Sequence, residues 1–447
     1  SAVVKHLTGK LGVSDSLANL MAQRNITTPE EAHAFFNPSL DYLHDPFLMK
    51  DMNIAVERLS TAIKKNEKIL VYGDYDVDGT TAVALVYSFL KEQYSNVEYY
   101  IPDRYKEGYG VSFQGLDFAA ENNCKLVITL DCGIKATEKI LYAKSKGIDV
   151  IICDHHYPGE NIPRALAVLD PKQPGCNYPY KELSGCGVGF KLIHAYSKIH
   201  AIPFSAIAQY LDLVAVSIAS DIVPITGENR VLAYYGLKQL NESPRTGLRE
   251  IIREAEINKA LTVEDVVFKI GPRINAAGRM ESGGRAVELL ISNDQKLATG
   301  ISKEINNYNN ERRSVDRVIT NEAMRMISED QRTSNAKTTV LFNPSWKKGV
   351  IGIVASRLIE TYYRPTVILT ESNGFATGSA RSVQGYDLYQ AIEACSDLLE
   401  SFGGHMFAAG LTLKKENIRP VMERFESYVN LTNNEDQMQP RILLDTE

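Results

Sequence analysis

Acidic and histidine residues follow three apolar stretches of the sequence, a pattern that suits divalent-metal chemistry. They are Asp74, Asp76, Asp78, Asp131, Asp154, His155 and His156. Carboxylates that converge on one point raise each other's pKa, and burial adds to the effect. Divalent cations remove that conflict. Mixed Asp and His ligation favours Mn²⁺, Zn²⁺ or Fe²⁺ over Ca²⁺, and a carboxylate-rich set favours Mn²⁺ or Mg²⁺ over Zn²⁺. The residue types therefore point to a metal centre, provided that the fold brings them together.

The stretches that precede these residues are predicted to be strands of a parallel sheet. They are short, rich in Val, Ile and Leu, and separated by helical segments: 68–72, 126–130, 150–153 and 165–169. Such runs are typical of a sheet buried on both faces. The carboxyl ends of the strands border the ligand site in an open parallel sheet, so the acids should meet there. Asp221, after the apolar helical stretch 211–220, is a further candidate.

The Asp-x-Asp-x-Asp-Gly segment alone could also be a calcium-binding loop of the EF-hand type. That loop needs a Glu six residues after its Gly and a helix on each side. Here Leu85 stands six residues after Gly79, and a predicted strand precedes the segment. The segment therefore does not fit an EF-hand loop. Two metals about 3.5–4 Å apart would instead suit phosphoester hydrolysis, because they hold a hydroxide and stabilise the leaving oxygen.

Composition sets the class of protein. The 447 residues predict two to three domains, and 44% hydrophobic with 23% charged residues is ordinary globular composition. The net charge of −6 excludes a wholly basic coat, though not a local basic groove. The six cysteines form no C-x-x-C pair, which favours a reducing compartment. No secretory signal and no membrane-spanning run is visible, so we expect a cytoplasmic protein.

The order of predicted elements gives an α/β fold class, with a parallel-sheet domain joined by a long helix to a smaller α/β domain. Helical spacing of apolar residues over 294–330 predicts the long helix. In the smaller domain we expect strands at 339–342 and 366–369 and helices near 351–361 and 388–402. The expected domains are an N-terminal helical extension at 1–50, a catalytic domain at 51–290, the connecting helix at 291–336, the smaller domain at 337–435 and a linker at 436–447.

These motifs resemble the DHH phosphoesterase superfamily and, within it, the RecJ family of single-strand-specific exonucleases. The matching segments are GDYDVDG, LDCG, DHH, SIASDIVPITGENR, GPRINAAGRM, IGIVASRL, GSARS and GGHMFAAG, in this order. The resemblance implies the parallel-sheet DHH domain, the DHH-associated domain and 5′-to-3′ hydrolysis of single-stranded DNA with two divalent ions, Mn²⁺ or Mg²⁺. RecJ proteins continue into an OB-type domain, toward which 436–447 would lead.

The resemblance also implies a role for each residue of the cluster. One metal would be held by Asp74, Asp76 and Asp131. The other would be held by Asp78, Asp131, His155 and Asp221, with Asp131 bridging. His156 would face the scissile phosphate, and Asp154 would orient the histidines. Tyr72 stands where some superfamily members carry a metal-binding His, so Asp74 would take over that role.

Further polar residues are candidates for contacts with the strand. The small residues of 271–280 allow a phosphate backbone to approach, and arginine forks onto phosphate oxygens. We expect loops at 271–280 and 379–382, and a glycine-rich loop at 403–405. The candidates there are Arg273, Asn275, Arg279, Ser379, Arg381, Ser382 and His405. By resemblance, Arg104 would bind the 5′-terminal phosphate and Tyr109 would stack on a base.

Two rival functions stay open. A DHH-family phosphodiesterase could act on short RNA oligonucleotides or cyclic dinucleotides, and a relative without metals could bind nucleic acid without cleaving it. The long N-terminal extension and the 271–280 segment favour the exonuclease, and every expected ligand is present. The expected partner is single-stranded DNA, with single-strand-binding protein and a helicase as further partners. We expect a monomer and no association with membranes.

Overall fold

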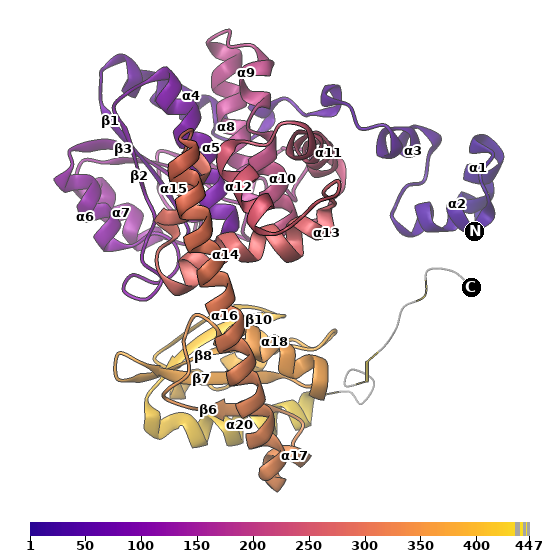
Figure 1. The fold of residues 1–447 in the computed structure, drawn as a ribbon, viewed down its shortest axis with the longest axis vertical. Coiled ribbons are helices and arrows are strands. Elements are labelled where there is room, and N and C mark those ends of the chain that lie inside the picture. Colours follow the sequence, from indigo (N-terminus) through magenta and orange to yellow (C-terminus); the bar gives the residue numbers. More distant parts are fainter. Residues whose placement is uncertain (434–438, 441–443, 445–447) are drawn as a thin grey trace. The chain divides into compact units, whose positions relative to one another are not determined.

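The computed structural model describes residues 1–433, 439–440 and 444 and contains two compact units, Ser1–Asn309 and Asn310–Glu447 (Figure 1). Helix α16 (Gln295–Glu329) crosses the boundary between them as one helix of 35 residues, close to the predicted 294–330. The predicted linker at 436–447 lies mostly outside the described residues. Among the described helices, none combines the length and apolar character that a membrane span requires.

The first unit is built on a parallel sheet of five strands in the order β2-β1-β3-β4-β5. The strands are β1 (Lys68–Gly73), β2 (Val97–Tyr100), β3 (Cys124–Leu130), β4 (Asp149–Cys153) and β5 (Ala167–Leu169). Four of them match the predicted apolar runs. Strand β2 was not predicted, because an edge strand is only half buried and its sequence, Val-Glu-Tyr-Tyr, is not an apolar run.

Helices cover both faces of this sheet, as the unbroken apolar strands predict. In β1, Ile69 and Val71 belong to one core, whereas Leu70 and Tyr72 belong to the other. Successive side chains of a strand point to opposite faces, so β1 contributes to both cores. The helices on the first face include α4 (Met52–Lys64), α5 (Val77–Gln93), α8 (Gly185–Ile199) and α10 (Leu211–Ser220), and those on the second are α6 (Phe113–Glu121) and α7 (Thr137–Ser145).

The remaining helices of this unit extend the first core or form the N-terminal extension. Those after β5 are α9 (Phe204–Ala208), α11 (Gly227–Glu242), α12 (Thr246–Glu254), α13 (Val263–Asp265), the π-helical turn η3 (Val266–Ile270), α14 (Gly271–Met280) and α15 (Gly283–Ile291). The extension holds α1 (Ala2–Leu11), α2 (Asp15–Gln23), α3 (Pro29–Phe36), η1 (Leu40–Tyr42) and η2 (Pro46–Leu48). Helices α1, α2 and α3 share a small core of their own around Leu7 and Met21.

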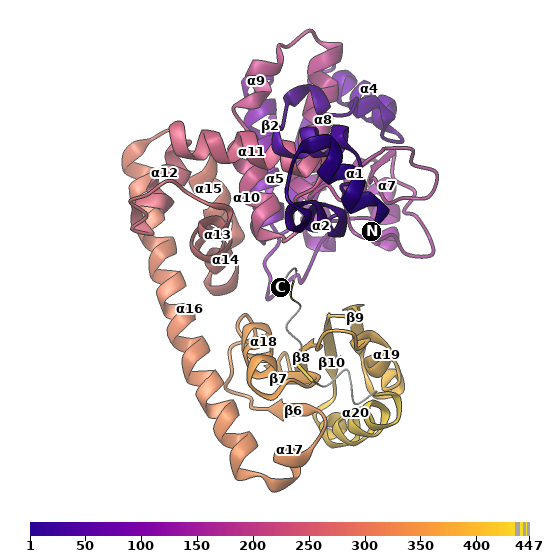
Figure 2. The same ribbon diagram turned by 90° about the vertical axis from the view of Figure 1, so that its right-hand side faces the viewer.

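The second unit contains a mixed sheet in the order β6-β7-β8-β10-β9, with only β6 and β7 parallel. Ile368 of β7 faces α16 and α18, whereas Val367 and Leu369 face α19 and α20, so helices cover both sides (Figure 2). Its elements after α16 are α17 (Gln331–Asn335), β6 (Thr339–Phe342), α18 (Ile351–Tyr362), β7 (Thr366–Ser372), β8 (Phe375–Arg381), α19 (Leu388–Glu393), η4 (Ser396–Leu398), β9 (Ser401–His405), β10 (Ala408–Leu413), η5 (Lys415–Asn417) and α20 (Ile418–Thr432).

Several local predictions were wrong. The helix predicted at 388–402 ends at Glu393, and β9 begins at Ser401. The loop expected at 271–280 is helix α14. A Cβ on Gly278 would lie 2.6 Å from the carbonyl oxygen of Tyr75, so this glycine serves close packing instead of breaking the helix. The loops expected at 379–382 and 403–405 lie largely in β8 and β9, where cross-strand pairing outweighs the low strand preference of glycine.

A fully buried ion pair ties the N-terminal extension to the rest of the first unit. Lys191 Nζ lies 2.5 Å from Glu228 Oε1 and donates to the His44 carbonyl at 3.0 Å. Glu228 also accepts from the His44 N–H at 2.7 Å and from the Tyr178 hydroxyl at 2.6 Å. Each charge is thus neutralised and hydrogen-bonded, the condition under which a buried ion pair is tolerated.

We predict that Lys191→Met destabilises the fold by about 3–5 kcal/mol, because it leaves the Glu228 carboxylate buried without its counter-charge. The double variant Lys191→Met with Glu228→Gln should recover part of that loss. The measurement is urea unfolding followed by far-UV circular dichroism. Lys198→Met, which breaks the exposed Lys198–Asp45 pair, is the control and should cost less than about 1 kcal/mol. Equal losses in Lys191→Met and Lys198→Met would contradict this account.

Candidate metal centre

The carboxyl ends of three central strands deliver acidic residues to one place. Asp74 follows β1 directly, Asp131 follows β3, and Asp154 follows β4. All three are buried. Asp76 caps α5, with its side chain accepting from Gly79 N–H at 3.0 Å. The parallel sheet therefore brings together acids that lie far apart in the sequence.

Asp78, in the first turn of α5, is held by the N-terminus of another helix. Its two oxygens accept from the N–H groups of Gly185 and Cys186, each at 2.7 Å, and Oδ1 also accepts from the Ser217 hydroxyl at 2.7 Å. Free N–H groups and the helix dipole favour a negative charge there. These bonds fix the position of the Asp78 carboxylate.

Asp131 takes a backbone conformation that few side chains tolerate. Its φ is 59°, in the left-handed region where Asp and Asn are the most accepted non-glycine residues. Its N–H donates to the Cys153 carbonyl at 2.9 Å. A Cβ on Gly185 would lie 2.7 Å from the Asp131 Cβ, so the start of α8 approaches Asp131 as closely as only glycine allows. The glycines of Gly-Cys-Gly-Val-Gly thus give α8 a tight start beside the acids.

The Nε2 atom of His155 lies among three carboxylates. It is 3.2 Å from Asp131 Oδ1, 3.6 Å from Asp78 Oδ2 and 3.6 Å from Asp221 Oδ2. His155 is buried, yet neither of its ring nitrogens makes a hydrogen bond, and Asp131 Oδ1 also has no hydrogen-bond partner. Buried polar atoms are almost always satisfied. The unsatisfied atoms and the donor set fit a divalent cation.

The electrostatics of the cluster also favour a bound cation. Burial raises the pKa of Asp131 well above its usual range, and Asp78 and Asp76 raise it further. Burial and Asp78 likewise raise the pKa of Asp221 to about 8. Burial lowers the pKa of His155, so this imidazole is held in the neutral form that can bind a metal. Without a counter-charge, the carboxylates resist ionisation.

Asp74 is buried against a loop that Tyr72 secures. Gly110 N–H donates to Asp74 Oδ1 at 3.2 Å, while Asp74 Oδ2 has no hydrogen-bond partner. The Tyr72 hydroxyl donates to the Gly110 carbonyl at 2.9 Å and accepts from Ser112 N–H at 3.1 Å. Tyr72 thus positions the loop against Asp74. Within the described residues, the ligand atoms of Asp74 and Asp76 do not join those of Asp131 in a group spanning 4.8 Å or less.

His156 is held by Asp154 and contacts Tyr109. Its Nδ1 lies 2.7 Å from Asp154 Oδ1, and its Nε2 lies 3.2 Å from the Tyr109 hydroxyl. Asp154 also accepts from Ile134 N–H at 2.9 Å and from His155 N–H at 2.8 Å, which places it beneath both histidines. Partial burial lowers the pKa of His156, but the bond to Asp154 outweighs this effect and raises it to about 9.

Two arginines of the first unit that were predicted to contact nucleic acid, Arg104 and Arg273, have different protein neighbours. The Arg104 guanidinium lies over the Tyr75 ring, 4.8 Å from its centroid. Arg273 donates to Asn306 Oδ1 at 3.0 Å and to the Lys269 carbonyl at 2.7 Å, so protein groups already engage it.

Two other predicted residues lie on α14, beside the acidic segment that follows β1. Asn275 Oδ1 accepts from Val77 N–H at 3.2 Å and so supports the start of α5. The Arg279 carbonyl accepts from the Tyr105 hydroxyl. Burial raises the pKa of Tyr75, and the Arg279 guanidinium is among the charges that oppose this rise. Tyr109 is 56% exposed, and its edge faces the Tyr75 ring.

In the second unit, the predicted polar residues lie around the β8–β10 pair. Arg381 Nη1 donates to Ser379 Oγ at 2.9 Å, and Ser382 Oγ donates to the Tyr386 carbonyl at 2.7 Å. Arg381 pairs with Ala408 across the sheet. His405 ends β9, and its Nδ1 accepts from Phe407 N–H at 3.2 Å. Sheet pairing thus brings the 379–382 and 405 segments together.

The sequence analysis missed supporting residues of the centre. Asp170 follows β5 as the other acids follow their strands, and it is fully buried. Burial, with a smaller contribution from the nearby Asp154, raises its pKa to about 7. The repeated strand-end position was a signal that could have identified Asp170. Ser217, which binds Asp78, lies within an apolar helix and gave no such signal.

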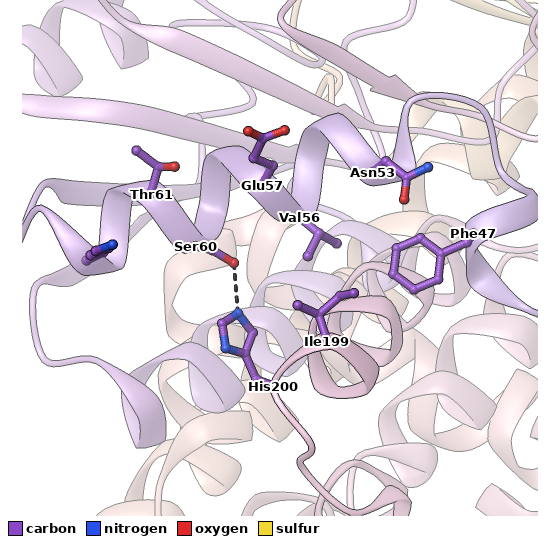
Figure 3. A pocket seen from close by; sticks show the side chains of 9 residues that line it. Phe47, Asn53, Val56, Glu57, Ser60, Thr61, Ile199 and His200 are labelled. Carbon is purple, nitrogen blue, oxygen red and sulfur yellow. Dashed lines mark hydrogen bonds between the residues drawn. The ribbon is translucent and has the colours of Figure 1, made fainter.

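A cavity of about 330 Å³ lies elsewhere in this unit, between α4 and the end of α8 (Figure 3). Ile199 and His200 line it, about 20 Å along the helix from Gly185 at 1.5 Å per residue. His200 Nε2 lies 2.8 Å from Ser60 Oγ, but Glu57, the carboxylate in the lining, points away from the ring in Figure 3. The lining therefore contains no serine–histidine–acid arrangement, and the acidic centre remains the candidate site.

Family models match both units. The DHH family, N-terminal domain, matches residues 68–218, and the DHHA1 domain matches 335–431. The single-stranded-DNA-specific exonuclease RecJ of Bacillus subtilis is 40% identical over 98% of this chain and 55% of its own length. The protein of the same name from Escherichia coli is 32% identical over 92% of this chain and 74% of its length. The chain thus spans about half of the first relative and three quarters of the second.

A solved structure shares the whole fold. RecJ from Thermus thermophilus, in complex with Mn²⁺, matches with a TM-score of 0.84 and 28% identity, over 97% of this chain and 61% of that one. A structure of exonuclease RecJ bound to manganese is 31% identical, with a TM-score of 0.76, over 91% of this chain and all of that one. With both domain matches, the relatives and the shared fold, the chain belongs to the RecJ family of DHH proteins.

Proposed function

We propose that this chain is a single-stranded-DNA-specific exonuclease that hydrolyses phosphodiester bonds from the 5′ end with two divalent cations, Mn²⁺ or Mg²⁺. The observation that carries the proposal is the unsatisfied His155 Nε2 among the carboxylates of Asp78, Asp131 and Asp221. The names of the related exonucleases support single-stranded DNA as the substrate, and the manganese-bound structures support the cation.

In this proposal the two cations share Asp131. One set of ligands would be Asp74, Asp76 and Asp131, and the other would be Asp78, Asp131, His155 and Asp221. When bound, such a pair supplies an activated water and neutralises charge that develops on the phosphate. The chain's own contribution is to hold these ligands in place through the α8 amides, Ser217 and the backbone conformation of Asp131.

His156 would act on the scissile phosphate. Asp154 fixes the ring through Nδ1, so Nε2 is the nitrogen left to face a phosphate oxygen. In the present structure Nε2 contacts the Tyr109 hydroxyl, which a phosphate oxygen would have to replace. Tyr109 would then be free to stack on the base at the 5′ end, with Arg104 on the terminal phosphate.

The other candidate residues would contact the phosphate backbone of the DNA strand. They are Arg273, Asn275, Arg279, Ser379, Arg381, Ser382 and His405. Arginine and hydroxyl donors are suited to phosphate oxygens and carry no base preference. Action as a cytoplasmic monomer, beside single-strand-binding protein and a helicase, belongs to the same proposal and is supported by membership of the RecJ family.

The test compares end-labelled single-stranded DNA, single-stranded RNA and duplex DNA, each with Mn²⁺ or Mg²⁺. We expect stepwise products from the 5′ end of single-stranded DNA alone. Short RNA oligonucleotides and cyclic dinucleotides are included, because preferential cleavage of these would favour the other phosphodiesterase class. Binding of DNA without cleavage in either metal would favour the non-enzymatic alternative.

We predict that Asp131→Asn removes metal-dependent stabilisation while leaving the metal-free protein at least as stable as the wild type. Asn suits the positive φ of Asp131, and it removes a buried acid whose ionisation burial and the neighbouring carboxylates oppose. Wild-type protein should gain about 2.7 kcal/mol from Mn²⁺ at 100 times its dissociation constant. Thermal unfolding with and without Mn²⁺ measures both effects, with exposed Glu121→Gln as the control. A full Mn²⁺ gain in Asp131→Asn would remove this residue from the shared position.

We predict that Arg104→Ala lowers kcat/KM about tenfold to hundredfold on 5′-phosphorylated strands and much less on 5′-hydroxyl strands. The reason is loss of a charge-assisted hydrogen bond to the terminal phosphate. Rates on the two matched oligonucleotides are compared with those of Lys106→Ala, an exposed cation of the same turn. The same loss on both substrates would show that Arg104 acts through general charge or through its packing on Tyr75.

A further inference from the structure

An exposed tyrosine directly follows the histidines of the metal centre. Tyr157 comes next after His156, so their Cα atoms are about 3.8 Å apart. The side chain is 71% exposed. Its hydroxyl makes no hydrogen bond to any other part of the described chain. The ring is therefore largely free of packing contacts, although its residue directly follows the two histidines of the centre.

One face of the Tyr157 ring is occupied by a cation. Lys172 Nζ lies 4.9 Å from the ring centroid. The lysine side chain is itself only 11% exposed and is secured by Glu182 at 3.3 Å. Its backbone N–H is fixed by Asp170 Oδ1 at 2.7 Å. A cation held in place on one face orients the ring and leaves the other face open to solvent.

The segment that holds Lys172 also lies next to the metal centre. Strand β5 pairs with β4, and the Asp154 N–H donates to the Leu169 carbonyl at 3.0 Å. Asp170 and Lys172 come just after β5, as Asp154 and Tyr157 come just after β4. The Tyr157–Lys172 pair thus lies at the same edge of the sheet as the acidic residues.

We propose that Tyr157, seated on Lys172, is a stacking platform for one nucleobase of the strand next to the scissile phosphate. The inference rests on the proposed function, because it assumes that His156 faces that phosphate. An open aromatic face accepts any base, so the platform would add affinity without sequence preference. The cation beneath the ring holds it in register with the centre. This assigns to Tyr157 a substrate contact distinct from that of Tyr109.

The test is strand binding in the Asp131→Asn background, with and without Tyr157→Ala, so that hydrolysis does not interfere. Fluorescence anisotropy gives the dissociation constants of a labelled single strand and of strands carrying one abasic position each. We expect Tyr157→Ala to weaken binding of the intact strand about 5- to 150-fold, and Tyr157→Phe to bind like the parent. Tyr234→Ala, an exposed tyrosine of α11, is the control and should have no effect.

The abasic series locates the base that is contacted. At one position near the scissile phosphate, removal of the base should weaken binding to the parent but cause no further loss in Tyr157→Ala, because the two changes remove one interaction. Full additivity at every position, or intact-strand binding equal to that of the Tyr234→Ala control, would overturn the proposal.

Hydrolysis of a substrate without a base distinguishes stacking by Tyr157 from a role of Tyr157 at the metal centre. On bis(p-nitrophenyl) phosphate, which has no base, Tyr157→Ala in the otherwise wild-type chain should match the wild-type rate. An equal loss on this small diester and on DNA would show that Tyr157 acts through the metal centre instead. Failure of the wild type to cleave any strand would refute the proposed function, and the binding series would still decide whether the platform exists.

Discussion

The structure depends on the electrostatic conflict around His155. Three carboxylates lie within 3.6 Å of one buried imidazole nitrogen. Such a set of charges is stable only if the protein fixes the groups firmly and a cation neutralises them. The firm support is visible: Asp78 on the amides of α8 and Ser217, and Asp131 in the left-handed conformation.

The parallel sheet and the glycines of the first unit allow the acidic residues to lie so close together. Only parallel strands end on a common edge, and only a glycine at the start of α8 fits against Asp131 while its amide reaches Asp78. Tyr72 provides comparable support for Asp74 through the Gly110 loop. The second unit contributes polar groups of another kind, hydroxyls and a guanidinium on paired strands, which are suited to phosphate contacts.

The features that the sequence predicted well are those determined by local pattern. The apolar runs before Asp74, Asp131 and Asp154 identified three strands and the convergence of the acids, and helical spacing identified α16. The failures concern residues whose role depends on distant neighbours. The glycines of α14 suggested a loop, but they allow contact with Tyr75 across the fold. Ser217, which binds Asp78, lies within an apolar helix, and no sequence pattern indicates that contact.

We propose that the acidic centre holds two cations that share Asp131. The most direct measurement is electron paramagnetic resonance of the wild-type chain titrated with Mn²⁺, combined with equilibrium dialysis for the number of ions bound. The account predicts two Mn²⁺ per chain and a spectrum of a spin-coupled pair in place of the six-line signal of isolated ions. One bound ion, or two ions that keep the isolated six-line signal throughout the titration, would contradict it.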